Sequence, residues 1–216
     1  MATSTLNLNH IAIEGGIGVG KTTLAQGLAT KLNANLLLED IDDNPFLELF
    51  YQDPERHGLS VQLSFLFSRL KQWQSLAQQD LFQSMMISDY IFAKDRLFAM
   101  TNLSDEEFAL YNQVAQAVTF DLPKPDLVIY LQSSPDVALK RIQQRNRNME
   151  KGVNLDYLKQ VTETFDKFFF HYQETPLLVV QTDRINFAER PEALDMLIAR
   201  ITQMGRGTEF WADYTE

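Results

Sequence analysis

The sequence contains no cysteine and no long apolar run, although 45% of its 216 residues are hydrophobic. Without cysteine the chain can form neither disulfides nor thiolate metal sites, which agrees with a reducing compartment. No stretch reaches the roughly eighteen apolar residues of a membrane-spanning helix, and the start, MATSTLNLNH, lacks the basic and apolar regions of a signal peptide. We therefore expect a cytoplasmic protein with no membrane partner.

Basic residues are also scarce: 19 lysines and arginines stand against 29 aspartates and glutamates, which gives a net charge of -10. This charge opposes binding to nucleic acid, so we expect no such partner. One segment reverses the sign, with cations at Lys140, Arg141, Arg145, Arg147 and Lys151. An acidic chain needs such a cluster if it is to hold a polyphosphate.

The stretch IAIEGGIGVGKTTLA, residues 11–25, predicts a strand, a glycine-rich loop and a helix. It fits G-x-x-x-x-G-K-[ST], the P-loop pattern, in which backbone N–H groups surround nucleotide phosphates. Lys21 would reach the β and γ phosphates of ATP, and the Thr22 hydroxyl would ligate Mg²⁺. An ordinary glycine-rich turn is the alternative. The expected ATP contacts in the loop are Gly15, Gly16, Gly18, Gly20, Lys21, Thr22 and Thr23.

Five short apolar runs alternate with longer helical stretches: HIAIE, NLLLED, SMMISD, DLVIYL and PLLVVQTD. Such runs, buried on both faces and joined by helices, are typical of a doubly wound α/β fold with a five-stranded parallel sheet. No internal repeat or Pro/Gly linker divides the chain, so we expect one domain over residues 1–204. For the tail, residues 205–216, we expect partial disorder or docking on another subunit.

Ligands of such sheets bind at the carboxyl ends of the strands, and this rule sorts the acids. Glu39 follows the second run, Asp89 the third and Asp183, on the ATP side, the fifth. Asp126 precedes its run, so we expect a surface residue at the opposite edge. Phosphoryl transfer needs a base near the accepting hydroxyl and a metal on the phosphates. We assign the base to Glu39 and a water-mediated Mg²⁺ contact to Asp89; an acidic turn entering a helix is the alternative for Glu39.

The segment after the fourth run predicts a helix followed by a loose turn. Ser134 and Pro135 mark its start, and Arg141 and Arg145 lie about one turn apart on one face. Arg147 falls on a different side. Asparagines and a glycine loosen the chain beyond the helix, so we predict a lid at about residues 141–152 whose arginines close over phosphates. A solvated, arginine-rich helix end is the alternative.

Gln62 and Arg69 are seven residues apart in the helical stretch LSVQLSFLFSRLKQW and therefore face the same way. That face is otherwise apolar, and a buried arginine needs a partner, for which Asp95 is the candidate. Arg69 would donate to ring acceptors of a nucleobase, and Asp95 would accept from an exocyclic amine. This scheme suits adenine, cytosine or guanine but not thymine. A purely structural ion pair is the alternative.

Taken together, these motifs resemble those of deoxynucleoside kinases, most closely the bacterial deoxyadenosine/deoxyguanosine kinase type, from about His10 to Ile201. Beside IEGGIGVGKTTLA the similarity includes LLLEDIDDNPFLELFYQDP, QLSFLFSR, SDYIFAKDRLFA, LVIYLQSSPDVALKRIQQRNRNME and YLKQV. The resemblance implies a homodimer that transfers the γ-phosphate of Mg·ATP to the 5′-hydroxyl of a purine deoxynucleoside in nucleotide salvage.

The resemblance also implies roles for single residues. It makes Glu39 the general base on the 5′-hydroxyl. The residues implied in nucleobase recognition are Gln62, Arg69 and Asp95, with Phe98 stacked on the base. Those implied in holding the 3′-hydroxyl are Tyr51 and Glu150. Those implied around the phosphates and the adenine of ATP are Arg141, Arg145, Arg147 and Phe187.

One departure from the family pattern matters. Many relatives have an arginine near the 5′-oxygen directly after the acid that ends the third strand, and this chain has Tyr90 there. A lid arginine, Lys94 or Arg96 could take its place, and the sequence does not choose among them.

Three alternatives for the function remain open. A thymidylate-type monophosphate kinase shares the P loop, sheet and lid, but it needs cations for the phosphate of its acceptor. Deoxycytidine is an alternative main acceptor. A nucleotide-binding switch usually carries N-K-x-D and D-x-x-G, and neither pattern occurs in this chain.

Overall fold

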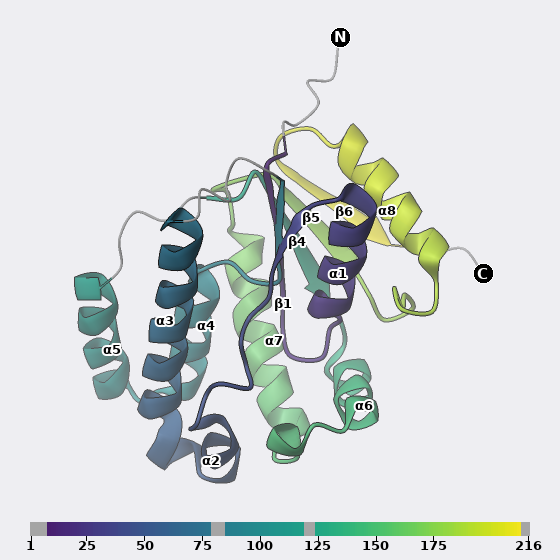
Figure 1. Cartoon of the computed structure of the whole chain (residues 1–216). Coiled ribbons are helices and arrows are strands. Elements are labelled where there is room, and N and C mark those ends of the chain that lie inside the picture. The colour runs from purple at the N-terminus through teal and green to yellow at the C-terminus, as the bar shows by residue number, and fades with distance from the viewer. Residues whose placement is uncertain (1–7, 79–84, 119–123, 213–216) are drawn as a thin grey trace.

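The computed structural model describes residues 8–78, 85–118 and 124–212 and shows an α/β fold (Figure 1). Its sheet has six strands in the order β2-β3-β1-β4-β5-β6, and all pairs are parallel. The strands are β1 (His10–Gly15), β2 (Asn35–Leu37), β3 (Met86–Ser88), β4 (Leu127–Gln132), β5 (Leu177–Gln181) and β6 (Thr208–Ala212). The chain builds outward on both sides of β1, which confirms the predicted doubly wound arrangement.

Within the described residues, eight α-helices connect these strands. They are α1 (Lys21–Leu32), α2 (Leu47–Gln52), α3 (Pro54–Gln78), α4 (Ala93–Asn102), α5 (Asp105–Val118), α6 (Pro135–Arg145), α7 (Leu155–Phe170) and α8 (Pro191–Gln203). A short 3₁₀ helix, Asn148–Glu150, lies between α6 and α7. None of the helices in the described ranges is long and apolar enough to cross a membrane.

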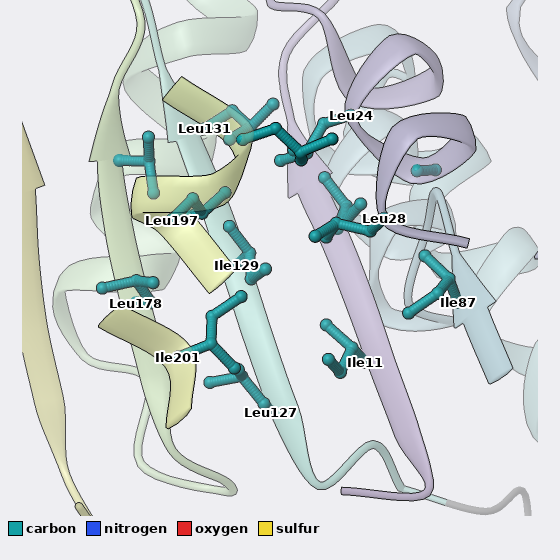
Figure 2. Close-up of a cluster of buried hydrophobic side chains, with 14 of the residues drawn as sticks. Ile11, Leu24, Leu28, Ile87, Leu127, Ile129, Leu131, Leu178, Leu197 and Ile201 are labelled. Atoms are coloured by element: carbon teal, nitrogen blue, oxygen red, sulfur yellow. The ribbon is translucent and has the colours of Figure 1, made fainter. Parts of the chain in front are cut away.

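One face of the sheet packs against α1 and α8 (Figure 2). Leu24 and Leu28 of α1 are one turn apart and therefore lie on the same side of the helix, where both are buried. Strand residues of the same cluster include Ile11, Ile129 and Leu178. This packing holds α1 against the sheet, and with it the P loop that joins α1 to β1.

The opposite face packs against α4 and α7, and α3 and α5 lie outside α4 (Figure 1). Phe165 and Phe169, one turn apart on α7, are buried, and the Phe169 ring stacks on Tyr130 of β4 with 4.1 Å between centroids. Leu66 of α3 and Tyr111 of α5 meet in a separate cluster beside α4. The α3–α4 pair therefore stands next to the carboxyl ends of β2 and β3.

The sixth strand corrects two expectations: the sheet has more than five strands, and the tail is ordered over residues 208–212. β6 pairs with β5, with Leu177 opposite Thr208. Threonine, phenylalanine and tryptophan favour extended backbone, and this segment contains all three. Trp211 packs against the core, and Glu209 pairs with Arg200 of α8. The expectation for residues 213–216 lies outside the described residues.

β2 is an edge strand of three residues, shorter than the apolar run that predicted it. Asn35 and Leu36 are exposed, so the prediction that this run is buried on both faces is wrong. The reason is its position, because an edge strand has a neighbour on one side only. The chain leaves the sheet after Leu37 and brings Glu39 into the cleft between α3 and the P loop.

Asp126 lies at the amino edge of the sheet, as predicted, and is half-buried there. Its carboxylate accepts hydrogen bonds from the backbone N–H groups of Asn9 at 2.7 Å and His10 at 2.9 Å. These bonds join the start of β1 to the start of β4. Asp126 is therefore occupied by the fold and stands away from the carboxyl edge.

Candidate active site

The P loop has the backbone that its glycines predict. Gly15, Gly18 and Gly20 have φ angles of 148°, 79° and 105°, a region that side chains disfavour. The Lys21 ammonium donates to the carbonyl of Gly15 at 3.0 Å and to that of Gly16 at 2.6 Å. Lys21 thus bends back over the loop at the positive end of α1, where an anion is favoured.

Gly18 also allows the loop to approach the lid helix. A Cβ at this position would lie 2.7 Å from the carbonyl oxygen of Ala138 in α6 and 2.8 Å from Ile142. Only glycine fits this contact. The P loop and the arginines of α6 are therefore held at a short, fixed separation.

Thr22 and Asp89 meet where the sequence predicts a Mg²⁺ site. The Thr22 hydroxyl donates to Asp89 Oδ2 at 2.8 Å, and the backbone N–H of Glu39 donates to Oδ1 at 2.7 Å. Hydroxyl and carboxylate oxygens beside a phosphate loop are ligands that Mg²⁺ takes together with phosphate oxygens and water. In the described part of the chain, no group of three or more His, Asp or Glu could hold a metal by itself. These residues fit a metal that arrives with a nucleotide.

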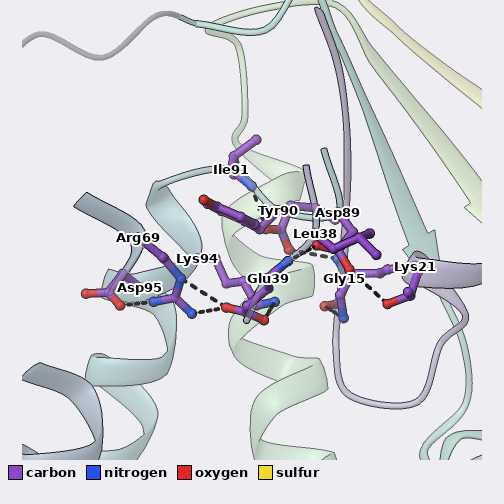
Figure 3. Close-up of polar contacts among 12 residues, drawn as sticks. Gly15, Lys21, Leu38, Glu39, Arg69, Asp89, Tyr90, Ile91, Lys94 and Asp95 are labelled. Carbon is purple, nitrogen blue, oxygen red and sulfur yellow. Dashed lines mark hydrogen bonds and ion pairs between the residues drawn. The ribbon is translucent and has the colours of Figure 1, made fainter. Parts of the chain in front are cut away.

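A buried cluster of four charged side chains lies between α3, α4 and the P loop (Figure 3). Arg69 Nε donates to Glu39 Oε1 at 3.0 Å, and another nitrogen of its guanidinium pairs with Asp95. The Lys94 ammonium donates to Glu39 Oε2 at 2.5 Å. All four side chains are at most 7% exposed. The predicted partnership of Arg69 with Asp95 is confirmed, and Glu39 joins the same network.

Burial alone would raise the pKa of Glu39, but the charges of Lys94 and Arg69 outweigh it and hold this pKa well below its usual range. Glu39 is therefore a carboxylate at neutral pH. Burial, together with the charge of Lys94, lowers the pKa of Lys21 to about 8. Near neutral pH, Glu39 therefore stays ionised, whereas Lys21 in the P loop changes its protonation more easily.

Two further side chains hold Asp95 in place. Gln62 Nε2 donates to the backbone carbonyl of Asp95 at 3.2 Å, which confirms that Gln62 and Arg69 face the same way on α3. The Tyr111 hydroxyl, from α5, donates to Asp95 Oδ2. Asp95 therefore has one oxygen on Arg69 and the other on Tyr111.

One cavity of about 300 Å³ connects these groups with the P loop. Its lining includes most of the predicted site: Gly18, Gly20, Lys21, Thr22, Thr23, Glu39, Tyr51, Gln62, Arg69, Asp89, Phe98, Arg141, Arg145, Glu150 and Phe187. Gly15, Gly16, Asp95, Arg147 and Asp183 are absent from it. Asp95 stands directly behind Arg69, and the two glycines lie under Lys21.

Tyr51 and Glu150 meet at the side of the cavity near the 3₁₀ helix. Burial, and then the neighbouring Tyr157 and Glu150, raise the pKa of the Tyr51 phenol well above its usual value. Glu150 is 5% exposed, and its carboxylate accepts from Arg145 Nε at 3.2 Å. A predicted sugar-binding acid therefore contacts a predicted lid arginine.

The three predicted lid arginines have different surroundings. Arg141 donates to the carbonyl oxygens of Val19 at 3.3 Å, Thr182 at 2.6 Å and Ile185 at 3.0 Å. It bridges the P loop and the loop after β5. Arg147 lies beyond the end of α6, in extended backbone before the 3₁₀ helix, so the helical pattern used to place it does not apply. Its guanidinium makes no hydrogen bond or ion pair with any described residue.

Asp183 and the two predicted aromatic residues, Phe98 and Phe187, each contact other parts of the fold. Asp183 accepts from the backbone N–H of Ser134 at 2.7 Å and from the Ser133 hydroxyl at 2.9 Å. It therefore fixes the start of α6. Phe98 meets Phe165 edge-on at 5.4 Å, and Phe187 packs against the core while it lines the cavity.

Three buried polar residues of the site were not assigned from the sequence: Glu14, Lys94 and Tyr111. Glu14, in β1, accepts from the backbone N–H groups of Gly15 and Ile91, both at 2.9 Å, and burial raises its pKa. An acid inside an apolar strand was the signal for it. Lys94 was named only as one replacement for a missing arginine. Tyr111 lies in an amphipathic helix, and no sequence motif there marks it as a site residue.

The fold and the phosphate loop define a P-loop kinase. A sequence profile described as deoxynucleoside kinase matches residues 11–205. The chain therefore belongs to the deoxynucleoside kinase family and is a kinase, which is against the nucleotide-switch alternative.

Known proteins similar to the chain agree with this family. The deoxyadenosine kinase of Dictyostelium discoideum is 35% identical over 199 residues, which cover 90% of this chain and 79% of that protein. The deoxyguanosine kinase of Bacillus subtilis (strain 168) is 32% identical over 199 residues, covering 90% and 96%. The solved structure of deoxyadenosine kinase from M. mycoides with bound dCTP has a TM-score of 0.78 at 23% identity, over 90% of this chain and 100% of that one. The structural match supports the fold.

Proposed function

We propose that this kinase transfers the γ-phosphate of Mg·ATP to the 5′-hydroxyl of purine deoxynucleosides in nucleotide salvage, with deoxyadenosine or deoxyguanosine as the better acceptor. The observation that carries the choice of base is the Arg69–Asp95 pair at the end of the cavity, with Gln62 beside it. The Arg69 guanidinium and the Gln62 amide line the cavity and offer donors and an acceptor to one edge of a nucleobase, while Asp95 fixes Arg69 from behind. The two similar proteins named for deoxyadenosine and deoxyguanosine support the same choice.

Glu39 accepts the proton of the 5′-hydroxyl as the hydroxyl oxygen attacks the γ-phosphorus. It suits this role because it is ionised, buried and fixed by Arg69 and Lys94 on opposite oxygens. The low pKa makes Glu39 a weak base in the empty site, so its first effect is to orient the hydroxyl. The proton moves to it as the O–P bond forms.

The remaining walls of the acceptor side hold the sugar and the base. Tyr51 and Glu150 bind the 3′-hydroxyl, since both line the cavity at the 3₁₀ helix. Phe98 stacks on the nucleobase. When Glu150 accepts from the sugar, its bond to Arg145 is weakened, which makes Arg145 available to the phosphates.

The donor side holds the nucleotide. Lys21 and the P-loop N–H groups bind its phosphates, while Thr22 and Asp89 would hold Mg²⁺, which would supply positive charge to the phosphates. The lid arginines Arg141, Arg145 and Arg147 stabilise the transferring group. Phe187 lies beside adenine. Asp183 supports the site indirectly by fixing the start of α6.

The acceptor side is less suited to a nucleoside monophosphate. Its cations, Arg69 and Lys94, are balanced by the carboxylates of Glu39 and Asp95, so the acceptor side has no excess positive charge for an acceptor's phosphate. Deoxycytidine remains a second candidate acceptor, because cytosine also carries an exocyclic amine next to a ring acceptor. A Bacillus subtilis relative named deoxyadenosine/deoxycytidine kinase is 28% identical over 202 residues.

We further propose a cytoplasmic homodimer. Large apolar side chains are about half exposed on three neighbouring helices: Phe67 of α3, Met100 of α4 and Leu110 of α5. A partner copy would cover such side chains. Light scattering tests this, and a monomeric mass at micromolar concentration would refute it.

The function is tested by ADP release from Mg·ATP with the four deoxynucleosides, adenosine and dTMP as separate acceptors. We expect turnover with deoxyadenosine or deoxyguanosine, weaker turnover with deoxycytidine and almost none with thymidine. Turnover only with dTMP would establish a monophosphate kinase. Silence with every acceptor would refute the proposed reaction.

A further inference from the structure

Lys94 occupies an unusual place for a lysine. It is the second residue of α4, which begins just beyond the carboxyl end of β3, and it is only 4% exposed. Lys94 lines the cavity, and its ammonium donates to Glu39 Oε2 at 2.5 Å (Figure 3). The side chain therefore stands next to the group that receives the proton in the proposed reaction.

The start of a helix is an unfavourable place for a buried cation. The first turn of a helix carries the positive end of its dipole, so a lysine in it is disfavoured, and a lysine is seldom buried without a partner. Glu39 is such a partner, but it already has the guanidinium of Arg69 on its other oxygen. Arg69 also serves Asp95, so the cluster balances two carboxylates with two cations, and Lys94 is the cation of the two whose charge reaches Lys21 at the P loop.

Lys94 also adjoins the phosphate end of the cavity. Its charge lowers the pKa of Lys21, which bends over the P loop, and both lysines line the same cavity. Two buried cations repel each other, and an anion that lies near both offsets this repulsion. Glu14 lies near both and offsets part of this repulsion from below the loop, and a nucleotide phosphate would do so from inside the cavity.

The other residues that could supply a cation at this point are directed elsewhere. Arg96 is exposed, with its guanidinium 5.8 Å from the centre of the Phe108 ring. Tyr90, at the position of the missing arginine, supplies no cation, and its hydroxyl donates to Gln72 Oε1 at 2.8 Å. Arg141 is bound to backbone carbonyls and Arg145 to Glu150. Lys94 alone of these contacts Glu39.

We propose that Lys94 is a catalytic residue, whose ammonium contacts the γ-phosphoryl oxygens and the 5′-oxygen during transfer. This rests on the proposed function. The proton of the 5′-hydroxyl goes to Glu39, the bond from the 5′-oxygen to the γ-phosphorus forms, and the bond to the β,γ-bridging oxygen breaks with its electron pair leaving on ADP. Lys94 keeps its protons throughout and stabilises the negative charge on the 5′-oxygen and the γ-phosphoryl oxygens.

The main test replaces Lys94 by methionine, which keeps the length of the side chain and removes its charge. We expect Lys94→Met to lower kcat by about 10²–10³-fold, the usual effect of losing a positioned charge-stabilising group. The KM values for ATP and deoxynucleoside should change by less than about threefold, because the groups that bind each remain in place. The control is Arg96→Met, which removes an exposed cation from the same helix and should leave kcat unchanged.

A second comparison separates catalysis from simple neutralisation of Glu39, and it removes the risk that an unpaired buried carboxylate unfolds the protein. Glu39→Gln removes the carboxylate that Lys94 neutralises, and the double variant Glu39→Gln/Lys94→Met loses both charges together. Single-turnover transfer from radiolabelled ATP is measured in both. If Lys94 is catalytic, the double variant should be at least about tenfold slower than Glu39→Gln.

The outcomes are distinct. Equal rates for the double variant and Glu39→Gln would overturn the proposal, because Lys94 would then act only as a counter-ion. A kcat of Lys94→Met within about threefold of the wild type, or a loss confined to KM, would overturn it as well. Failure of the wild type to phosphorylate any deoxynucleoside would instead refute the proposed function, before any variant is compared.

Discussion

The acceptor and donor halves of the cleft hold their charges in different ways. On the acceptor side, Arg69, Glu39 and Asp95 are at most 7% exposed and pair with one another. On the donor side, Arg141 bonds to backbone carbonyls, and the Arg145 side chain is 36% exposed. In the proposed reaction the acceptor half is therefore formed before substrate arrives, whereas the donor half would be completed by the phosphates.

The difference follows from the chemistry of the two ligands. A deoxynucleoside is neutral, so the protein must supply both signs of charge, and buried ion pairs fix their geometry in advance. A nucleoside triphosphate brings its own negative charge, so arginines that bind it do not each need a carboxylate. Among the described residues Arg141 and Arg147 form no ion pair with a carboxylate, and Arg145 pairs with Glu150. Four changes test this contrast, from the largest expected effect to the smallest.

Glu39→Gln should have the largest effect, because it removes the proton acceptor while keeping the size of the side chain. We expect kcat to fall by about 10²–10⁴-fold with deoxynucleoside binding retained, as measured by steady-state kinetics and calorimetry. The matched control is Asp40→Asn at the exposed neighbouring position. Near wild-type turnover of Glu39→Gln would mean that the acceptor half only binds.

Arg69→Ala tests whether the acceptor half is a unit. The change leaves Glu39 and Asp95 buried without their shared cation, so the free energy of unfolding should fall by about 3–5 kcal/mol. Urea denaturation measures it, and the exposed Arg96→Ala should differ from wild type by no more than about 0.5 kcal/mol. The KM for deoxynucleosides should rise and the choice of base should relax. A loss of stability under about 1 kcal/mol would show that the pairs are dispensable.

Arg147→Gln tests the donor half in the opposite sense. The guanidinium makes no hydrogen bond or ion pair with the described residues, so the unfolding free energy should change by less than about 0.5 kcal/mol. If Arg147 closes onto the phosphates, kcat should still fall, by about tenfold or more. An unchanged kcat would remove Arg147 from the lid, and a large loss of stability would contradict the contrast itself.

The smallest expected effect is at Lys21, which should take up a fraction of a proton when Mg·ATP binds. The pKa of Lys21 in the free protein is about 8, below its usual value, so part of the population is neutral at pH 8. Because phosphates favour the ammonium form, binding of Mg·ATP at pH 8 should take up about half a proton, and at pH 7 about a tenth. ATP affinity should therefore weaken as pH rises through 8. Calorimetry in two buffers with different ionisation enthalpies measures the uptake, and equal values at both pH values would refute it.

Much of the donor half could be predicted from local sequence. The glycines, Lys21 and Thr22 lie in one stretch, and the apolar run before them fixes the strand that presents the loop. The arginine positions on α6 follow from helical spacing. The seven-residue spacing of Gln62 and Arg69 likewise predicted one buried face of α3, because the helical period is a local property.

The acceptor half depends on segments far apart in the chain. Glu39 follows β2, Arg69 is on α3, Lys94 on α4 and Tyr111 on α5. No local pattern states which oxygen of Glu39 each cation takes, or that Tyr111 reaches Asp95. For the same reason β6 was missed, since five residues next to glycines become a strand only when an open edge of β5 is available to pair with.

The sequence by itself determined the doubly wound fold, the phosphate loop and the list of charged residues at the carboxyl edge, because these follow from periodicity and from motifs a few residues long. The tertiary structure alone decided how those charges combine. It placed Lys94 on Glu39 and left Arg96 in solvent, and it ordered the tail as an edge strand. Such choices depend on long-range packing, which sets distances between residues that the chain itself keeps apart.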